Sequence, residues 1–188
     1  MEALLVSTLV VGLAEIGDKT QLLALVLAVR YKRSVPVLVG LTVATLANHA
    51  LAAGVGQLAA DLLHPEFLRW SLVVLFACMA GWALIPDHFR RDEAERGRGH
   101  GPFITATVAF FFLEMGDKTQ IATIALAAKY DAFFAVLIGS TVGLVLVTAP
   151  VVVLGHLFAA RIRLEWVRLA AAGMFFSLSL WVAIRGLG

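Results

Sequence analysis

Six apolar segments, each long enough to cross a lipid bilayer, constrain this 188-residue chain more than any other feature. They cover residues 3–29, 35–60, 67–86, 102–128, 132–159 and 165–186. A helix needs about 20 apolar residues to cross a hydrocarbon layer that is roughly 30 Å thick. The composition agrees, because 61% of the residues are hydrophobic and only 15% are charged. The sequence therefore predicts an all-α integral membrane protein with six transmembrane helices.

The two halves of the chain resemble each other. Displacing the numbering by 99 places EIGDKTQ, which starts at Glu15, on EMGDKTQ, which starts at Glu114. Without a gap, the same displacement aligns Tyr31 with Tyr130, Gly40 with Gly139, Thr42 with Thr141, Gly56 with Gly155 and Arg69 with Arg168. This pattern predicts one membrane domain over residues 1–188, built from a duplicated three-helix unit. We expect repeat 1 at 1–86, a charged cytoplasmic loop at 87–101 and repeat 2 at 102–188.

The odd number of spans in each unit predicts the relative orientation of the two halves. The second unit enters the membrane from the side opposite to the first, which gives the inverted repeat common in secondary transporters. Outside the motifs, ten Lys and Arg residues fall on one predicted side and three on the other. Because cytoplasmic loops carry the excess of positive charge, we expect both termini outside the cytoplasm, in a multi-pass protein of the cell (inner) membrane.

The repeated motif contains the only acidic residues that fall inside the predicted spans rather than in loops or at span ends. Of the 13 acidic residues, four do so, namely Glu15, Asp18, Glu114 and Asp117. Each charge at bilayer depth costs about 2.5–3.5 kcal/mol, so the four need compensation. Lys19 and Lys118 each follow a motif glutamate by four residues, and we expect them to approach it on the same helical face. Two negative charges then remain, which match one divalent cation or two protons.

The residue types in the motif predict a site for a hard cation. Glu and Asp three residues apart share one helical face, and inverted pairing would bring two such faces together. Hydroxyl and amide oxygens of Thr20, Thr119, Gln21 and Gln120 could complete an oxygen cage, and Gly17 and Gly116 permit a helix break that frees backbone carbonyls. Such oxygens suit magnesium, calcium or manganese, whereas zinc and copper usually recruit histidine or cysteine. Because burial favours the protonated carboxylate, we expect protons to compete with the metal.

The histidine and amide side chains Asn48, His49 and His156 lie within the spans but outside the duplicated motif. Asn48 and His49 correspond to Val147 and Thr148 in the second half, so they are not part of a symmetric core. They either line the path of the ion or hydrogen-bond between helices. His156 is interpreted as structural. The simplest structural alternative for the motif itself is that each Glu-Lys pair is a buried bridge that holds helices together.

At AEIGDKTQ and LEMGDKTQ the chain resembles the membrane divalent-cation/proton exchangers with twin Glu-x-Gly-Asp-Lys/Arg-Thr/Ser motifs. That family includes bacterial manganese exporters and eukaryotic Golgi calcium and manganese transporters. The resemblance implies that Glu15, Asp18, Glu114 and Asp117 bind the cation, with the motif threonines nearby and the glutamines as further candidates. It also implies alternating access and removal of metal from the cytosol. The compact length looks like the bacterial members, which favours Mn²⁺ and leaves Ca²⁺ open.

Two other functions compete with cation exchange. A six-helix exporter of amino acids or other small amine solutes would use the acidic excess to hold an amine, although only the motif lysines offer a clamp for an anion. A non-transporting scaffold would use the motifs only to bridge helices. No enzyme is expected, because the sequence contains no nucleophile-base pair, phosphate loop or cofactor motif. No cofactor is expected either, since the metal ion and the protons are the cargo.

Overall fold

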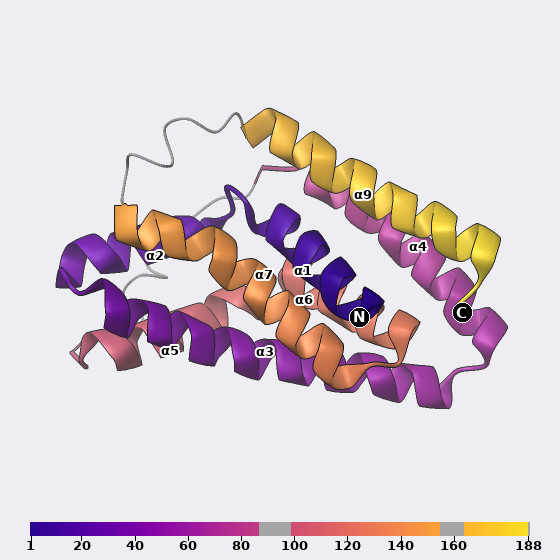
Figure 1. Cartoon of the computed structure of the whole chain (residues 1–188), viewed down its shortest axis with the longest axis horizontal. Helices are drawn as coiled ribbons and strands as arrows, with labels where there is room; N and C mark the ends of the chain where they lie inside the picture. Colours follow the sequence, from indigo (N-terminus) through magenta and orange to yellow (C-terminus); the bar gives the residue numbers. More distant parts are fainter. Residues whose placement is uncertain (87–98, 155–163, 188) are drawn as a thin grey trace.

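The computed structural model describes residues 1–86, 99–154 and 164–187, and within them the chain is helical throughout (Figure 1). The first half contains α1 (Glu2–Glu15), α2 (Lys19–Tyr31), α3 (Ser34–Leu62) and α4 (Pro65–Ala83). The second half contains α5 (Pro102–Glu114), α6 (Lys118–Tyr130), α7 (Phe133–Leu154) and α9 (Leu164–Arg185). The predicted all-α class is therefore confirmed for the described residues. Most of the predicted loop at 87–101, together with His156 and Gly155, lies outside them.

Four of these helices are long and apolar enough to cross a membrane. They are α3 and α4 in the first half and α7 and α9 in the second half. The apolar segments 3–29 and 102–128 each form two helices, divided at the helix break that Gly17 and Gly116 were expected to permit. At about 1.5 Å per residue, α1 with 14 residues and α5 with 13 residues are too short to cross the hydrocarbon layer alone.

Both interruptions have the same backbone geometry, and glycine is the reason. Gly17 and Gly116 each have φ of 78°, in the left-handed region that favours glycine and ends a right-handed helix. In each break the N–H of the motif aspartate donates to the carbonyl of the motif glutamate, at 3.1 Å for Asp18 and 3.1 Å for Asp117. The duplicated sequence thus folds into the same helix-turn-helix twice.

The first helix of each half packs against a long helix of the other half. Helix α1 lies along α7, while α5, the counterpart of α1, lies along α3, the counterpart of α7. Glycines permit both crossings: a methyl group at Gly40 would lie 2.7 Å from the Phe103 carbonyl oxygen, and one at Gly139 would lie 2.5 Å from that of Leu4. The motif helices α2 and α6 contact α7 and α3 respectively, so both breaks lie at the interface between halves.

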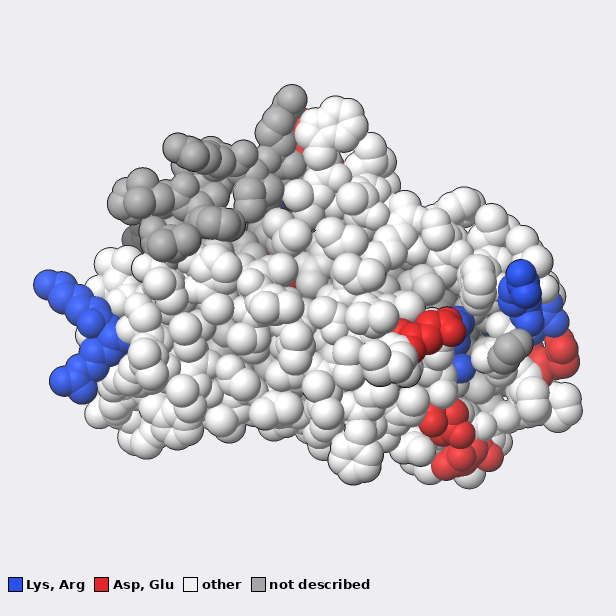
Figure 2. All heavy atoms as spheres, viewed as in Figure 1, with Lys and Arg blue, Asp and Glu red and all other residues white. Residues whose placement is uncertain are grey.

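The remaining pair, α4 and α9, lies side by side along one edge of the molecule (Figure 1). On the face drawn in Figure 2, Lys and Arg lie at one end of the long axis, Asp and Glu lie with further basic residues toward the other end, and the surface between them is mostly uncharged. Within the helices, many large apolar side chains are exposed, for example Leu9, Leu51, Val74 and Phe176. An apolar belt between two charged ends is the surface expected of a protein that lies in lipid.

Candidate metal centre

The four motif carboxylates lie at the two breaks, buried in the interior. Glu15 and Glu114 are the last residues of α1 and α5, and Asp18 and Asp117 occupy the N-cap positions of α2 and α6. Their exposed fractions are between 0 and 4%. Aspartate at an N-cap usually accepts a hydrogen bond from the first helical turn, but neither of these two makes a side-chain capping bond. The two aspartate carboxylates therefore do not cap the helices that they precede.

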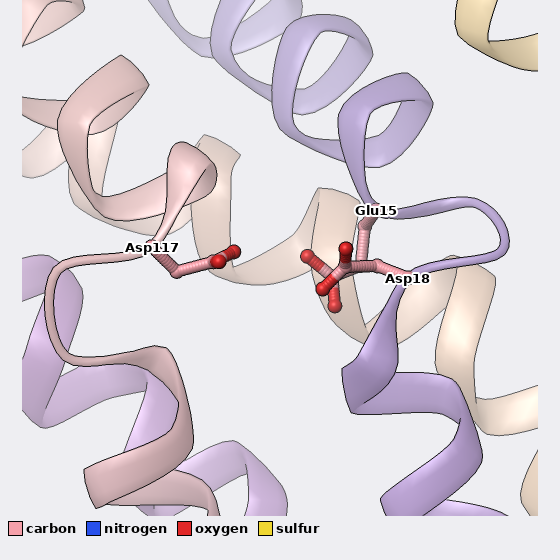
Figure 3. Close-up of side chains that lie close together, drawn as sticks. All are labelled: Glu15, Asp18 and Asp117. Atoms are coloured by element: carbon pink, nitrogen blue, oxygen red, sulfur yellow. The ribbon is translucent and has the colours of Figure 1, made fainter. Parts of the chain in front are cut away.

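Three of the four carboxylates come together between the halves. Glu15, Asp18 and Asp117 each place one carboxylate oxygen within 4.8 Å of those of the other two. Figure 3 shows Asp117 pointing from the second break toward Glu15 and Asp18 at the first break. Three buried like charges at this separation repel one another strongly unless a cation or protons neutralise them. The arrangement therefore requires a positive partner.

Lys19 of the first motif supplies a positive charge to Asp117 of the second motif. Its Nζ lies 3.0 Å from Asp117 Oδ1, and the two side chains are 20% and 3% exposed. Lys19 and Glu15 do not share a helical face as expected, because α1 ends at Glu15 and α2 begins only at Lys19. Its ammonium group forms an ion pair with the motif of the opposite half.

Lys118 corresponds to Lys19 in the second motif, but the structure also connects it to the end of α4. It is buried, with 5% of its surface exposed. Its Nζ donates to the Ile85 carbonyl oxygen at 3.3 Å and lies 6.0 Å from the centre of the Trp82 ring. The helix break before Lys118 likewise removes the helical face that it was expected to share with Glu114.

Glu114 is not among the three converging carboxylates. The Thr45 hydroxyl of α3 donates to it and lies 3.2 Å from Oε1 and 3.2 Å from Oε2. Sequence reasoning did not identify Thr45, although its position one turn before Asn48 in an apolar segment was a signal for a polar face on α3. The charges of Glu15 and Asp117 also act on Glu114, so the cage of four carboxylates stays a prediction, with three of its members within 4.8 Å of one another.

The other predicted oxygen ligands fall into two groups. Thr20 and Thr119 are buried, and their hydroxyls have no hydrogen-bond partner among the described residues. By contrast, the Gln21 and Gln120 side-chain oxygens accept hydrogen bonds from the motif glycines, at 3.0 Å from Gly17 N and 2.6 Å from Gly116 N. The glutamines thus satisfy backbone groups that the breaks expose, whereas the threonine hydroxyls stay available to a ligand.

Asn48 and His49 make contacts between helices. Asn48 Nδ2 donates to the Phe111 carbonyl oxygen at 2.9 Å, and His49 Nδ1 lies 3.4 Å from Thr141 Oγ1. Both side chains are fully buried in α3. The interpretation of these residues as interhelical hydrogen-bond partners agrees with these contacts.

Chemically, the cluster of Glu15, Asp18 and Asp117 offers carboxylate oxygens, and a threonine hydroxyl follows each aspartate two residues further along the chain. This donor set fits a hard divalent cation. No histidine or cysteine belongs to the cluster among the residues that the structure describes. The site can therefore hold an ion of the magnesium, calcium or manganese type between the two halves.

Comparison with known proteins gives consistent results. The family model described as "Divalent cation/proton antiporter GDT1" matches residues 3–91 and 102–188. A Vibrio cholerae protein named "Putative manganese exporter" is 49% identical over 184 residues, which cover 97% of this chain and 91% of the relative. The Synechocystis "GDT1-like protein sll0615" is 31% identical over 89% of this chain and 90% of its own length. The Arabidopsis thaliana "GDT1-like protein 3" is 28% identical over 95% of this chain and 69% of its own length. No solved structure matches.

Proposed function

The chain belongs to the GDT1 family of divalent cation/proton antiporters, and on that premise we propose that it exports Mn²⁺ from the cytosol in exchange for protons. The observation that carries the proposal is the convergence of Glu15 and Asp18 from the first motif with Asp117 from the second. A cation between these residues contacts both halves of the protein. Its binding is therefore coupled to their relative position, as transport requires.

The charge of the cluster supports a divalent cargo. Three carboxylates together with the Lys19 ammonium leave a formal charge of minus two, which one divalent ion neutralises. Thr20 and Thr119 are further candidate ligands, because their buried hydroxyls have no partner among the described residues. The cation is cargo, so the protein needs no additional cofactor.

The choice of metal and the direction of transport follow from different observations. An oxygen-only donor set is compatible with both Mn²⁺ and Ca²⁺. The name of the Vibrio cholerae relative, with which this chain shares 49% identity, favours Mn²⁺ and export. We therefore place Mn²⁺ first and keep Ca²⁺ as the second candidate cargo.

Exchange with protons follows from the repulsion within the cluster. When the metal leaves, three buried carboxylates remain within 4.8 Å of one another. Protonation relieves that repulsion, and a protonated carboxylate is a poor ligand for a metal. Metal and protons thus exclude each other at one site, which is the minimum requirement for an antiporter.

We propose that each broken helix pair, α1 with α2 and α5 with α6, crosses the membrane once. Together with α3, α4, α7 and α9 this gives six crossings in two inverted repeats. The exchanged packing of α1 on α7 and of α5 on α3 supports this relation. Both termini then lie on one side of the membrane, which agrees with their position toward the same end of the molecule (Figure 1), and the distribution of Lys and Arg favours the outside. Rocking one repeat against the other would expose the cluster to each side in turn.

Transport into proteoliposomes tests the proposal. With an imposed pH gradient, we expect Mn²⁺ flux with the wild type and none with Asp117→Asn. Asp61→Asn is the matched control, because Asp61 is exposed near the end of α3, and it should transport normally. Ca²⁺ flux is followed in parallel to establish selectivity. If neither metal moves and amine solutes stabilise the protein instead, it is an exporter of small amines.

A further inference from the structure

The chain has two tyrosines, and each of them joins the two halves of the protein. Tyr31 is the last residue of α2, and its hydroxyl donates to Thr105 Oγ1 of α5 at 3.0 Å. Tyr130 is the last residue of α6, and its hydroxyl donates to Glu2 Oε1 of α1 at 3.2 Å. The tyrosines occupy equivalent positions in the two repeats, so the duplicated unit makes the same kind of contact twice.

These two contacts lie on opposite sides of the carboxylate cluster. Helices α2 and α6 both begin at the helix breaks, and from there α2 extends toward one end of the molecule and α6 toward the other (Figure 1). Each helix has 13 residues, so its tyrosine lies about 18 Å along the helix from the break. On the proposed topology, Tyr31 therefore lies toward the cytoplasm and Tyr130 toward the outside.

Alternating access requires the halves to separate at one end while they stay together at the other. Separation of α2 from α5 breaks the hydrogen bond of Tyr31, and separation of α1 from α6 breaks that of Tyr130. Tyr31 packs against the same apolar core as Ala109, and Tyr130 packs against the same core as Val10. Opening of either end would thus expose one of two side chains that are now at most 1% exposed.

We infer that Tyr31 and Tyr130 are gate residues, of which Tyr31 holds the cytoplasmic end closed and Tyr130 holds the outer end closed. This rests on the proposed function, in which the two ends open in turn. The partners of the tyrosines differ, because Thr105 is buried and neutral whereas Glu2 is exposed and acidic. Neither tyrosine is among the proposed metal ligands, so each gate can be weakened without a change to the metal site.

The rate at which a charged, membrane-impermeant thiol reagent reacts with buried positions measures each gate. Ala109→Cys reports on the cytoplasmic end and the equivalent Val10→Cys on the outer end, both with Cys78→Ser because Cys78 is exposed. Tyr31→Phe should make Ala109→Cys react about three- to tenfold faster from the cytoplasmic side, since loss of one hydrogen bond shifts a closed population by about that factor. Tyr130→Phe should do the same for Val10→Cys from the outside. Neither variant should speed the reaction at the opposite end.

Further variants separate the hydrogen bond from a general loosening of the helices. Glu2→Gln keeps an acceptor oxygen and should behave like the wild type. Glu2→Leu should reproduce Tyr130→Phe, and the double variant should add no further effect. Thr107→Val and the equivalent Thr8→Val are the matched controls, because each hydroxyl donates to a carbonyl of its own helix, at 2.9 Å and 2.8 Å.

Unchanged reactivity at the end whose tyrosine is altered, or an equal increase at both ends, would overturn the inference. The labelling needs no metal, so its outcome is distinct from failure of the proposed function, in which the wild-type protein itself would bind and transport no Mn²⁺.

Discussion

Lys19 of the first motif forms an ion pair with Asp117 of the second motif, with 3.0 Å between Nζ and Oδ1. The pair joins the two halves at the point where three carboxylates meet. An ammonium group at this position neutralises part of the charge that a metal ion would otherwise neutralise. On the proposed function, Lys19 is a cation attached to the protein, and we expect it to compete with the metal for the same carboxylate.

Removal of this competitor should strengthen metal binding. In Lys19→Met, Asp117 loses its ammonium partner and the cluster gains one unit of negative charge. We expect Mn²⁺ to bind about tenfold more tightly, and the protein to melt at a lower temperature when no metal is added. Binding and melting are measured on the same purified sample, with and without Mn²⁺.

Lys32→Gln is the control for Lys19→Met, since Lys32 is exposed beyond the other end of α2. It removes the same charge at a distance from the cluster and should leave affinity unchanged. Weaker binding in Lys19→Met would mean that the lysine organises the site rather than competing with the metal.

Acid should weaken Mn²⁺ binding, because protons and metal share the carboxylates of Glu15, Asp18 and Asp117. As pH falls, a larger fraction of the cluster is protonated, so the apparent dissociation constant should rise steadily. Isothermal titration in buffers of different ionisation enthalpy should also detect proton release on binding. Affinity that does not depend on pH would contradict proton exchange at this site.

The helix breaks should tolerate no side chain at the motif glycines. Gly116→Ala places a Cβ at φ of 78°, where strain of about 1–3 kcal/mol is expected, although no atom lies within 4 Å of it. We expect lower thermal stability together with weaker Mn²⁺ binding, because Glu114 and Asp117 flank the break. Gly173→Ala is the control, since Gly173 lies within α9 and also has open space around it. A Gly116→Ala protein with normal stability and affinity would exclude backbone strain as the reason for this glycine.

The crossing of α1 and α7 should depend on Gly139. A methyl group there would lie 2.5 Å from the Leu4 carbonyl oxygen and 3.0 Å from Ser7 Cβ, so the two helices would have to separate. We expect Gly139→Ala to lower stability by about 1–3 kcal/mol, as overpacking does. Gly173→Ala again supplies the comparison in thermal unfolding. Equal melting temperatures for the two variants would show that α1 and α7 do not cross this closely.

Much of the site could be predicted from the sequence because the motif is both charged and duplicated. Carboxylates in apolar segments must be neutralised, and glycine within a motif permits a break in the helix. These arguments select Glu15, Asp18, Glu114 and Asp117 from the sequence alone, and the structure brings Glu15, Asp18 and Asp117 within 4.8 Å of one another. Both arguments depend only on the properties of the residues in the motif, so they need no knowledge of how the helices pack.

The pairings between distant residues could not be predicted in the same way. The four-residue spacing of Glu15 and Lys19 suggested a pair on one helical face, but the two residues belong to different helices and the lysine forms an ion pair with Asp117. Thr45 was missed because its role depends on α3 lying against α5, a contact that sequence spacing does not specify. Duplication also suggested equal roles for Glu15 and Glu114, whereas unlike residues on α3 and α7 make their surroundings different.

The most direct test of the account is equilibrium binding of Mn²⁺ to the purified protein, with free Mn²⁺ measured by electron paramagnetic resonance. The account predicts one bound ion per chain in the wild type, and a loss of affinity of at least about tenfold in both Asp18→Asn and Asp117→Asn. Asp131→Asn, which changes an exposed aspartate at the end of α6, should bind like the wild type. Full Mn²⁺ affinity in either Asp18→Asn or Asp117→Asn would contradict a cation site formed by both motifs.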